Sequence, residues 1–309
     1  MRAGSVNIIA FVALISLLGG ITVVGITHED DDRPYIYTTM SWQQEMVQEI
    51  VGDTYTVKSF LPPNSDPHST DLTPGSLPSG NTVAYFAIGS HVEWEERNLS
   101  VIKDELNILT FECCEELIER GDMEHLLPGH CHHGGHDHSD HDHHDSADPH
   151  VWTSPERLGQ IAEYITEKLI ELDPENEAIF REGCDSYTAK TDELAVYAEI
   201  LENKADATII VWHPSWAYLL PANVTEEPML ETAQTQTTPS QMLQLVMGTA
   251  EDPIKVFLSN EREIKGMTEA ELGGSGVYVK IIVINVLASD WLDELYKAIT
   301  VFGEELEAA

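Results

Sequence analysis

The sequence predicts an α/β protein with two lobes, each built around a mostly parallel sheet and joined by one long rigid helix. Short apolar runs of strand length alternate with helix-like segments between residues 34 and 120, and the alternation resumes between residues 207 and 302. Such alternation predicts parallel strands that are covered by helices. About thirty residues between these stretches can be helical, and a helix of that length, roughly 45 Å, suits a connector between lobes. A chain of 309 residues is also long enough for two domains.

The first half of the chain contains four apolar runs of strand length. They lie at residues 34–40, 55–61, 82–88 and 106–111. The last two are almost continuously apolar, as expected of parallel strands that are covered on both faces. Apolar side chains recur with helical spacing after Ser41, which predicts a helix capped by that residue and ending near Val51. A second helix is predicted at residues 113–120.

An acidic, histidine-rich segment follows and reads HCHHGGHDHSDHDHHDSADPHVW from residue 130. It contains two adjacent glycines and almost no apolar residues, so we predict a mobile loop, at residues 125–149, that builds no core. Imidazole suits zinc, copper and nickel, and the interleaved aspartates add oxygen donors. We therefore predict an auxiliary metal-binding loop. Its histidines are His130, His132, His133, His136, His138, His141, His143 and His144.

Helical sequence resumes directly after the histidine-rich loop. Thr153 or Ser154 can cap a helix that has Pro155 at its first position. The long connecting helix is then expected at residues 173–203. Gly183 is its one weak point, so two shorter helices that break at this glycine are the alternative.

The second lobe is predicted at residues 204–309, and the first lobe, with the histidine-rich loop, at residues 33–172. Strands of the second lobe are expected at residues 207–212, 254–260 and 277–285, and its helices at residues 239–251 and 290–302. Ser289 is placed to cap the last of these helices.

The N-terminus predicts export from the cytoplasm. Arg2 precedes an uncharged apolar stretch at residues 8–26, and four acidic residues follow at 29–32. A basic end before an apolar core, with acidic residues beyond it, is typical of an export signal. The apolar stretch is also just long enough to span a bilayer. Residues 1–28 are therefore interpreted as either a signal peptide or an uncleaved anchor.

The composition excludes one class of partner. The chain has 16 basic and 54 acidic side chains, which give a net charge of −38, so nucleic acid would be repelled. The same charge suits a cation-handling surface or a protein that stays soluble in salt. Among the cysteines, Cys113 or Cys114 can pair with Cys184 in an oxidising compartment, whereas Cys131 can add a thiolate to the histidine-rich loop.

Three histidines outside that loop are candidate metal ligands. His68 follows a predicted strand and a proline-rich turn, His213 directly follows another strand, and His150 stands between the histidine-rich loop and the next helix. Ligands of open α/β sheets bind at the carboxyl ends of strands, so these side chains are expected to meet between the lobes. Three neutral imidazoles make a good zinc site, whose fourth position is left to water or a carboxylate.

At these motifs the sequence resembles the zinc-specific solute-binding proteins of ABC importers, the ZnuA-like group of the TroA-like metal-binding family. The segments that carry the resemblance are PPNSDPH with His68, DPHVWTSPERL with His150 and WHPSWAYLL with His213. The resemblance covers residues 33–300 and is strongest between residues 55 and 220. It implies two α/β lobes that hold a metal between them with little domain closure, and it implies these three histidines as ligands.

The fourth ligand is the main departure from that family. The family has an acid at the end of a late strand, and the comparable segment here reads VINVLAS, with Asn285 at that place. An amide is a poorer zinc ligand than a carboxylate, so water, Asp66 or Asp290 are the alternatives. His91, near another predicted strand end, is a further candidate, either as the fourth ligand or as a group that supports the ligands.

The motifs and the resemblance together predict a protein that captures Zn(II) outside the cytoplasm and delivers it to an ABC-type metal permease with a cytoplasmic ATPase. We expect a monomer that meets the membrane surface through the permease, or through its N-terminal segment where this is retained. Two alternatives remain: the same role for manganese or iron, and an extracellular metal buffer without a transport partner. An enzyme is not expected, because HExxH, GxSxG and a carboxylate placed as a general base are all missing from the sequence.

Overall fold

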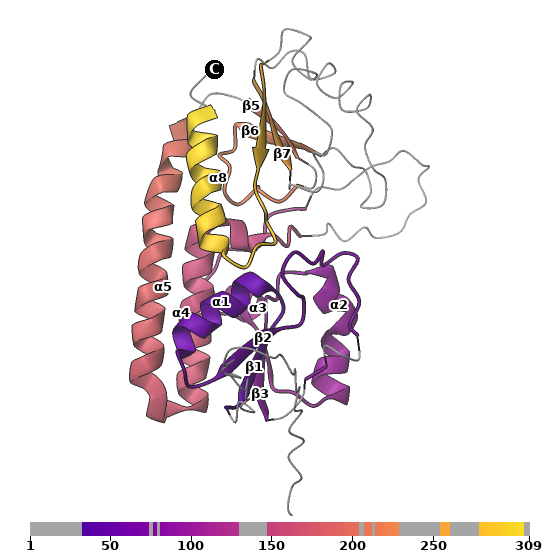
Figure 1. Cartoon of the computed structure of the whole chain (residues 1–309), viewed down its shortest axis with the longest axis vertical. Coiled ribbons are helices and arrows are strands. Elements are labelled where there is room, and N and C mark those ends of the chain that lie inside the picture. Colours follow the sequence, from indigo (N-terminus) through magenta and orange to yellow (C-terminus); the bar gives the residue numbers. More distant parts are fainter. Residues whose placement is uncertain are drawn as a thin grey trace, which may run out of the picture. The chain divides into compact units, whose positions relative to one another are not determined.

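The structure of the chain is a computed structural model (Figure 1), which describes residues 33–73, 77–78, 81–129, 147–203, 207–211, 214–228, 254–259 and 278–305. The predicted signal or anchor at residues 1–28 and the helix expected at residues 239–251 lie outside the described residues, as do residues 130–146 of the histidine-rich loop. Of the helices that are described, none is both long and apolar enough to cross a membrane.

The first sheet has four parallel strands in the order β2-β1-β3-β4. They are β1 (Tyr35–Thr38), β2 (Thr56–Ser59), β3 (Thr82–Ala87) and β4 (Thr110–Glu112). Tyr85 and Phe86 are consecutive residues of β3, so their side chains point to opposite faces of the sheet, and both are fully buried. The sheet is therefore covered on both faces, as its apolar strands require.

The helices of the first sheet are α1 (Ser41–Val51), α2 (Glu93–Ser100), which continues as a π-helical turn (Val101–Glu105), and α3 (Cys113–Arg120). Met40, rather than the predicted Ser41, occupies the N-cap of α1. The strand predicted at residues 106–111 is shorter and later than expected. The π-helical turn ends at Glu105, directly before the predicted strand, and Asn107 then has a left-handed conformation with φ 52°. The extended strand therefore begins only at Thr110.

Helix α4 (Pro155–Leu172) begins as its sequence predicts. Ser154 is the N-cap, and its hydroxyl accepts a hydrogen bond from the backbone N–H of Arg157 at 3.3 Å. Backbone N–H groups in the first turn of a helix have no partner within the helix. Proline has no N–H, so nothing is lost when it occupies the first helical position.

Helix α5 (Glu177–Ala198) is the long connecting helix, preceded by a 3₁₀ turn (Pro174–Asn176) and followed by another (Glu199–Asn203). It passes through Gly183 without a break, so the alternative of two shorter helices is wrong. Figure 1 shows α5 alongside α4 and alongside the last helix, α8 (Trp291–Glu305), and it also packs against α1.

The second sheet also has four parallel strands, in the order β6-β5-β7-β8. They are β5 (Ala207–Val211), β6 (Val224–Pro228), β7 (Ile254–Ser259) and β8 (Tyr278–Val283). Strand β6 was not predicted, because its sequence VTEEP combines two glutamates and a proline, which strands disfavour. Helix α8 starts two residues after the predicted cap, Ser289. Two parallel sheets and a long helix confirm the predicted fold class.

Four buried tryptophans connect the two halves of the chain. The rings of Trp42 and Trp152 are stacked with centroids 6.0 Å apart, and those of Trp216 and Trp291 lie 6.1 Å apart. The indole of Trp291 donates a hydrogen bond to the carbonyl oxygen of Trp152 at 2.7 Å, and the indole of Trp152 donates to that of Val286 at 3.2 Å. Apolar contact and hydrogen bonds therefore hold the loop after β8 against the segment that carries His150.

The three described cysteines are Cys113, Cys114 and Cys184, and each is buried and free. The disulfide that the sequence left open is therefore not formed among them. Burial raises the pKa of the Cys113 and Cys114 thiols, which keeps them protonated and poorly reactive.

Candidate metal centre

Two of the three predicted ligands lie next to each other. The ring centroids of His68 and His150 are 6.4 Å apart, and the ring planes are inclined by 52°. Two imidazoles that share a tetrahedral zinc ion, with Zn–N bonds of about 2 Å, have centroids about 5 Å apart. The rings must therefore approach by about 1 Å to bind one ion.

The third predicted ligand, His213, lies outside the described residues, as do the eight histidines of the histidine-rich loop between His130 and His144. Within the part of the chain that the structure describes, no group of three or more His, Cys, Asp or Glu side chains forms a metal site. The described centre is therefore a pair of imidazoles and the groups that hold them.

Asp148 holds both the backbone and the ring of His150. One carboxylate oxygen, Oδ1, accepts a hydrogen bond from the His150 backbone N–H at 2.9 Å and lies 2.7 Å from its ring Nδ1. Both side chains are buried. A carboxylate on Nδ1 favours the tautomer that carries its proton there and its lone pair on Nε2, which is the form that binds a metal.

His68 has a similar but looser arrangement in the loop after β2. Oδ1 of Asp66 accepts a hydrogen bond from the His68 backbone N–H at 2.9 Å. Oε2 of Glu93, on α2, lies 3.5 Å from the ring Nδ1 of His68, and the Glu93 side chain is 55% exposed. The carboxylate beside this ring is therefore farther away and better solvated than the one beside His150.

Arg97 attaches the His68 loop to α2. Its guanidinium donates hydrogen bonds to three backbone carbonyl oxygens of the loop, those of Pro67, His68 and Thr70, at 3.2, 2.9 and 3.1 Å. Because this planar group has several donors in a fixed arrangement, one side chain holds the backbone on both sides of the predicted ligand, His68.

The segment after His213 is held by a buried carboxylate of β6. Oε1 of Glu226 accepts hydrogen bonds from the backbone N–H groups of Ser215 and Trp216, at 3.0 and 2.9 Å. Burial raises the pKa of Glu226 to about 7, although these two hydrogen bonds lower it, and the nearby Asp148 raises it slightly further. At each predicted ligand, a carboxylate thus accepts a hydrogen bond from a nearby backbone N–H. The N–H is that of the histidine itself at His68 and His150, and that of Ser215, two residues along the chain, in the case of His213.

The candidates for the fourth ligand have structural partners of their own. Asn285, on the loop after β8, donates a hydrogen bond from its amide to Oδ1 of Asn64, while its own Oδ1 accepts one from the Leu287 backbone N–H at 3.2 Å. Asn64 belongs to the His68 loop, so this amide ties that loop to the second half of the chain. Asp66 is occupied with the backbone of His68, and Asp290 is exposed in the turn before α8.

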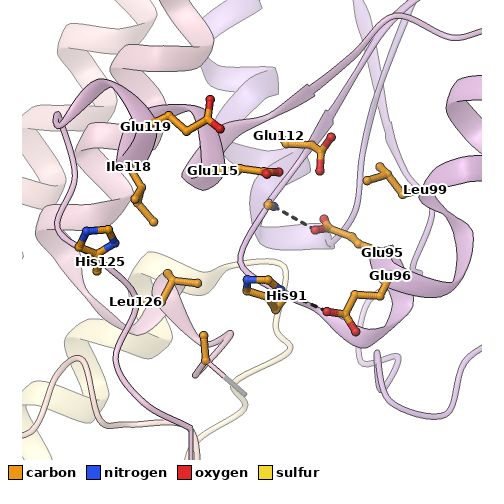
Figure 2. Close-up of a pocket in the computed structure, with 12 residues that line it drawn as sticks. His91, Glu95, Glu96, Leu99, Glu112, Glu115, Ile118, Glu119, His125 and Leu126 are labelled. Atoms are coloured by element: carbon orange, nitrogen blue, oxygen red, sulfur yellow. Dashed lines mark hydrogen bonds and ion pairs between the residues drawn. The ribbon is translucent and has the colours of Figure 1, made fainter. Parts of the chain in front are cut away.

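His91 faces an acidic cavity rather than the His68–His150 pair. The cavity has a volume of about 490 Å³ and lies where β3 and β4 end, and its ionisable lining includes His91, Glu96, Glu112, Glu115, Glu119 and His125. Figure 2 shows the His91 ring directed at Glu96, with Nδ1 of the ring 3.2 Å from Oε1 of the carboxylate. The pKa of Glu115 is raised, first by its hydrogen bond with Glu112 and then by burial.

The sequence predicts His68 and His150 as ligands, and the structure brings their rings together. It predicts Asp66 as an alternative fourth ligand and not as the group that holds the His68 backbone. It assigns no role to Asp148, Arg97 or Glu226. Asp148 stood within the DPHVW motif, two residues before the ligand, and its spacing from His150 repeats that of Asp66 from His68. That repeat was the available signal. Nothing in the sequence indicates that Arg97, in α2, would hold the backbone of the His68 loop. The same is true of Glu226, in β6, and the backbone after His213.

Comparison with protein families gives one match over most of the chain. Residues 36–298 match the family model described as ZnuA, zinc-uptake complex component A periplasmic. The zinc-binding lipoprotein AdcA of Streptococcus pneumoniae is 28% identical over 191 residues, which are 61% of this chain and 37% of that protein. The chain thus matches little more than a third of the length of this relative.

Solved structures share the fold. The Zn(II)-bound ZnuA-like domain of Streptococcus pneumoniae AdcA superposes with a TM-score of 0.68 at 18% identity, over 89% of this chain and 99% of that one. The solute-binding protein FpvC from Pseudomonas aeruginosa, in complex with Mn²⁺, superposes with a TM-score of 0.65 at 18% identity, over 90% and 100%. Proteins with this fold are thus known with Zn(II) and with Mn²⁺ bound, so the fold alone does not identify a metal.

Proposed function

Because this chain belongs to the ZnuA family of zinc-uptake components, we propose that it captures Zn(II) outside the cytoplasm and delivers it to an ABC-type permease driven by a cytoplasmic ATPase. The family is one of solute capture rather than catalysis. The protein acts as a monomer, and its N-terminal segment exports it or anchors it at the membrane.

The observation that carries the proposal is the adjacent pair of His68 and His150, each with a carboxylate near Nδ1. Imidazole ligands suit zinc, whereas carboxylate and carbonyl oxygens suit manganese. His213 supplies the third imidazole, and water or a carboxylate completes the tetrahedron. The histidine-rich loop raises the local concentration of metal without forming the tight site.

Metal binding by the full-length chain tests the capture step. We expect one tight zinc site in competition with a chromogenic chelator. His68→Ala, His150→Ala and His213→Ala should each weaken it by about 100-fold or more, because each removes one of a few strong bonds. His91→Ala is the matched control and should leave affinity unchanged. Tight binding that survives the His68→Ala/His150→Ala double change would overturn the site.

The histidine-rich loop is tested separately. Replacement of its eight histidines with serine should remove weak binding and leave the tight site intact. Loss of the tight site in this variant would contradict the division of roles. A tight site that prefers Mn²⁺ to Zn²⁺ would support the alternative cargo.

Uptake of radioactive zinc by cells tests the delivery step. Cells that lack the chain should take up zinc slowly at low external concentration, and the unaltered chain, but not the His150→Ala variant, should restore uptake. Unchanged uptake without the chain would support a metal buffer that has no transport partner.

A further inference from the structure

The hydroxyl of Tyr218 lies at the base of the histidine-rich loop. It accepts a hydrogen bond from the backbone N–H of Leu127 at 3.0 Å and donates one to the carbonyl oxygen of Asp148 at 2.8 Å. These residues lie on either side of the segment at residues 130–146. Burial raises the pKa of Tyr218 to about 12, so the hydroxyl keeps the proton that it donates to Asp148.

The two ends of the loop also pair with each other. The Asp148 backbone N–H donates to the carbonyl oxygen of Leu127 at 2.8 Å, and Pro128 and Ala147 form an isolated antiparallel bridge. Asp148 is therefore held by both of its backbone polar groups. Its N–H donates to the Leu127 carbonyl oxygen, and its own carbonyl oxygen accepts from the Tyr218 hydroxyl.

Tyr218 itself is well fixed. It belongs to a turn in which the Leu219 and Leu220 N–H groups donate to the carbonyl oxygen of Trp216 at 2.9 Å each. Its ring lies 4.7 Å from the guanidinium carbon of Arg157, which donates hydrogen bonds to backbone carbonyl oxygens shortly before Leu127. In the sequence, this turn begins three residues after His213. One rigid turn therefore connects the third predicted ligand with the backbone of Asp148.

We propose that Tyr218 is a positioning residue of the zinc site, which sets the position of His150 by holding the backbone of Asp148. The inference rests on the proposed function and adds a residue that acts through another. The Asp148 carboxylate holds both the backbone N–H and the ring of His150. A small displacement of Asp148 thus moves the ring that must approach His68 to share an ion.

The test removes one hydroxyl and keeps the ring. Tyr218→Phe preserves the contact with Arg157 and loses both hydrogen bonds, and we expect zinc affinity to fall by about tenfold, as for other residues that support a ligand. The visible spectrum of bound Co(II), which reports ligand geometry, should change as well. Tyr197→Phe, on an exposed part of α5, is the matched control and should change neither.

A double-mutant cycle shows whether Tyr218 acts through Asp148. In the Asp148→Asn background, Tyr218→Phe should cost much less than tenfold, because the ring of His150 is then no longer held by the carboxylate. Full additivity of the two changes would overturn the inference.

The outcomes separate this inference from the proposed function. Unchanged affinity and Co(II) spectrum in Tyr218→Phe, with tight binding lost in His150→Ala, would contradict the role of Tyr218 alone. If His150→Ala also keeps tight binding, both proposals are wrong.

Discussion

Oδ1 of Asp148 lies 2.7 Å from Nδ1 of His150, and both side chains are buried. The corresponding pair at the first predicted ligand, Glu93 and His68, is separated by 3.5 Å and partly exposed. The two imidazoles are thus held unequally. If both rings bind one metal ion, we expect His150 to keep its position and His68 to move toward the ion.

Asp148→Asn should therefore weaken zinc binding by about 10- to 100-fold, because the neutral amide holds the imidazole tautomer and orientation less firmly. Glu93→Gln should cost only a few-fold, since an exposed pair at 3.5 Å contributes little. Chelator competition at pH 7.5 measures both. A larger loss from Glu93→Gln than from Asp148→Asn would refute the assignment of His150 as the more rigid ligand.

Gly183 allows α5 to pass close to α1, and Gly183→Ala should destabilise the fold. A Cβ at this position would lie 2.4 Å from the carbonyl oxygen of Glu49 and 2.6 Å from Cα of Ile50. These are backbone atoms, so the helices must separate. We expect the free energy of unfolding to fall by about 2–3 kcal/mol, measured by urea denaturation of the metal-free protein.

Gly303→Ala in α8 is the matched control, because it makes the same glycine-to-alanine change within a helix but without a close backbone contact. A Cβ there would lie 3.6 Å from a methyl carbon of Ile200, which is ordinary contact. This change should be neutral or stabilise the protein by up to about 1 kcal/mol. If both glycine changes have the same effect, close approach of α1 and α5 is not what requires glycine at position 183.

Most strands, α3 and α4 could be predicted because their signals are local. The Ser154 cap and Pro155 are adjacent in sequence, and each apolar run shows its own burial. The adjacent rings of His68 and His150 are candidate ligands in the sequence because each histidine stands in a short motif at the end of an element. The aspartate two residues before each histidine is also a local feature, but the sequence predicts Asp66 only as an alternative fourth ligand and assigns no role to Asp148.

The groups that hold these loops could not be predicted, because each acts on backbone far away in sequence. Tyr218 contacts backbone atoms 91 and 70 residues earlier, and Arg97 contacts backbone 27–30 residues earlier. Every residue has a backbone N–H or carbonyl group, so the sequence does not show which of these groups a distant side chain will contact. Strand β6, which presents Glu226, was missed for a related reason: its pairing with β5, and not its own sequence, makes it a strand.

Salt should stabilise the fold strongly, because the chain carries a net charge of −38. Like charges are close: the pKa of Glu45 is raised first by burial and then by the charges of Asp290, Asp293 and Glu49. The screening length falls from about 10 Å at 0.1 M salt to about 3 Å at 1 M. We expect the melting temperature of the metal-free protein to rise by about 10 °C or more over this range.

The shape of the salt dependence identifies its cause. Screening predicts that most of the rise occurs below about 1 M NaCl, whereas strengthened apolar burial would continue to increase at higher concentrations. A melting temperature that is flat below 1 M would show that repulsion among the carboxylates does not limit stability.

Glu226 should make stability depend on pH. Its folded-state pKa is about 7, above the ordinary value of 4.5, so between these values the folded protein keeps a proton that the unfolded chain has lost. The stabilising contribution is complete below pH 4.5 and is lost as the pH rises through 7. Its size is at most about 3 kcal/mol.

Glu226→Gln removes this titration while keeping the shape of the side chain and an oxygen that accepts from Ser215 and Trp216. The free energy of unfolding of the wild type, relative to this variant, should therefore fall between pH 4.5 and pH 8, by up to about 3 kcal/mol. Urea denaturation of metal-free protein at several pH values measures this difference, in which the other carboxyl groups cancel. Glu175→Gln, at an exposed site, should show no such trend. A difference between wild type and Glu226→Gln that is constant with pH would mean that Glu226 is ionised in the fold throughout this range, and that its two backbone hydrogen bonds outweigh its burial.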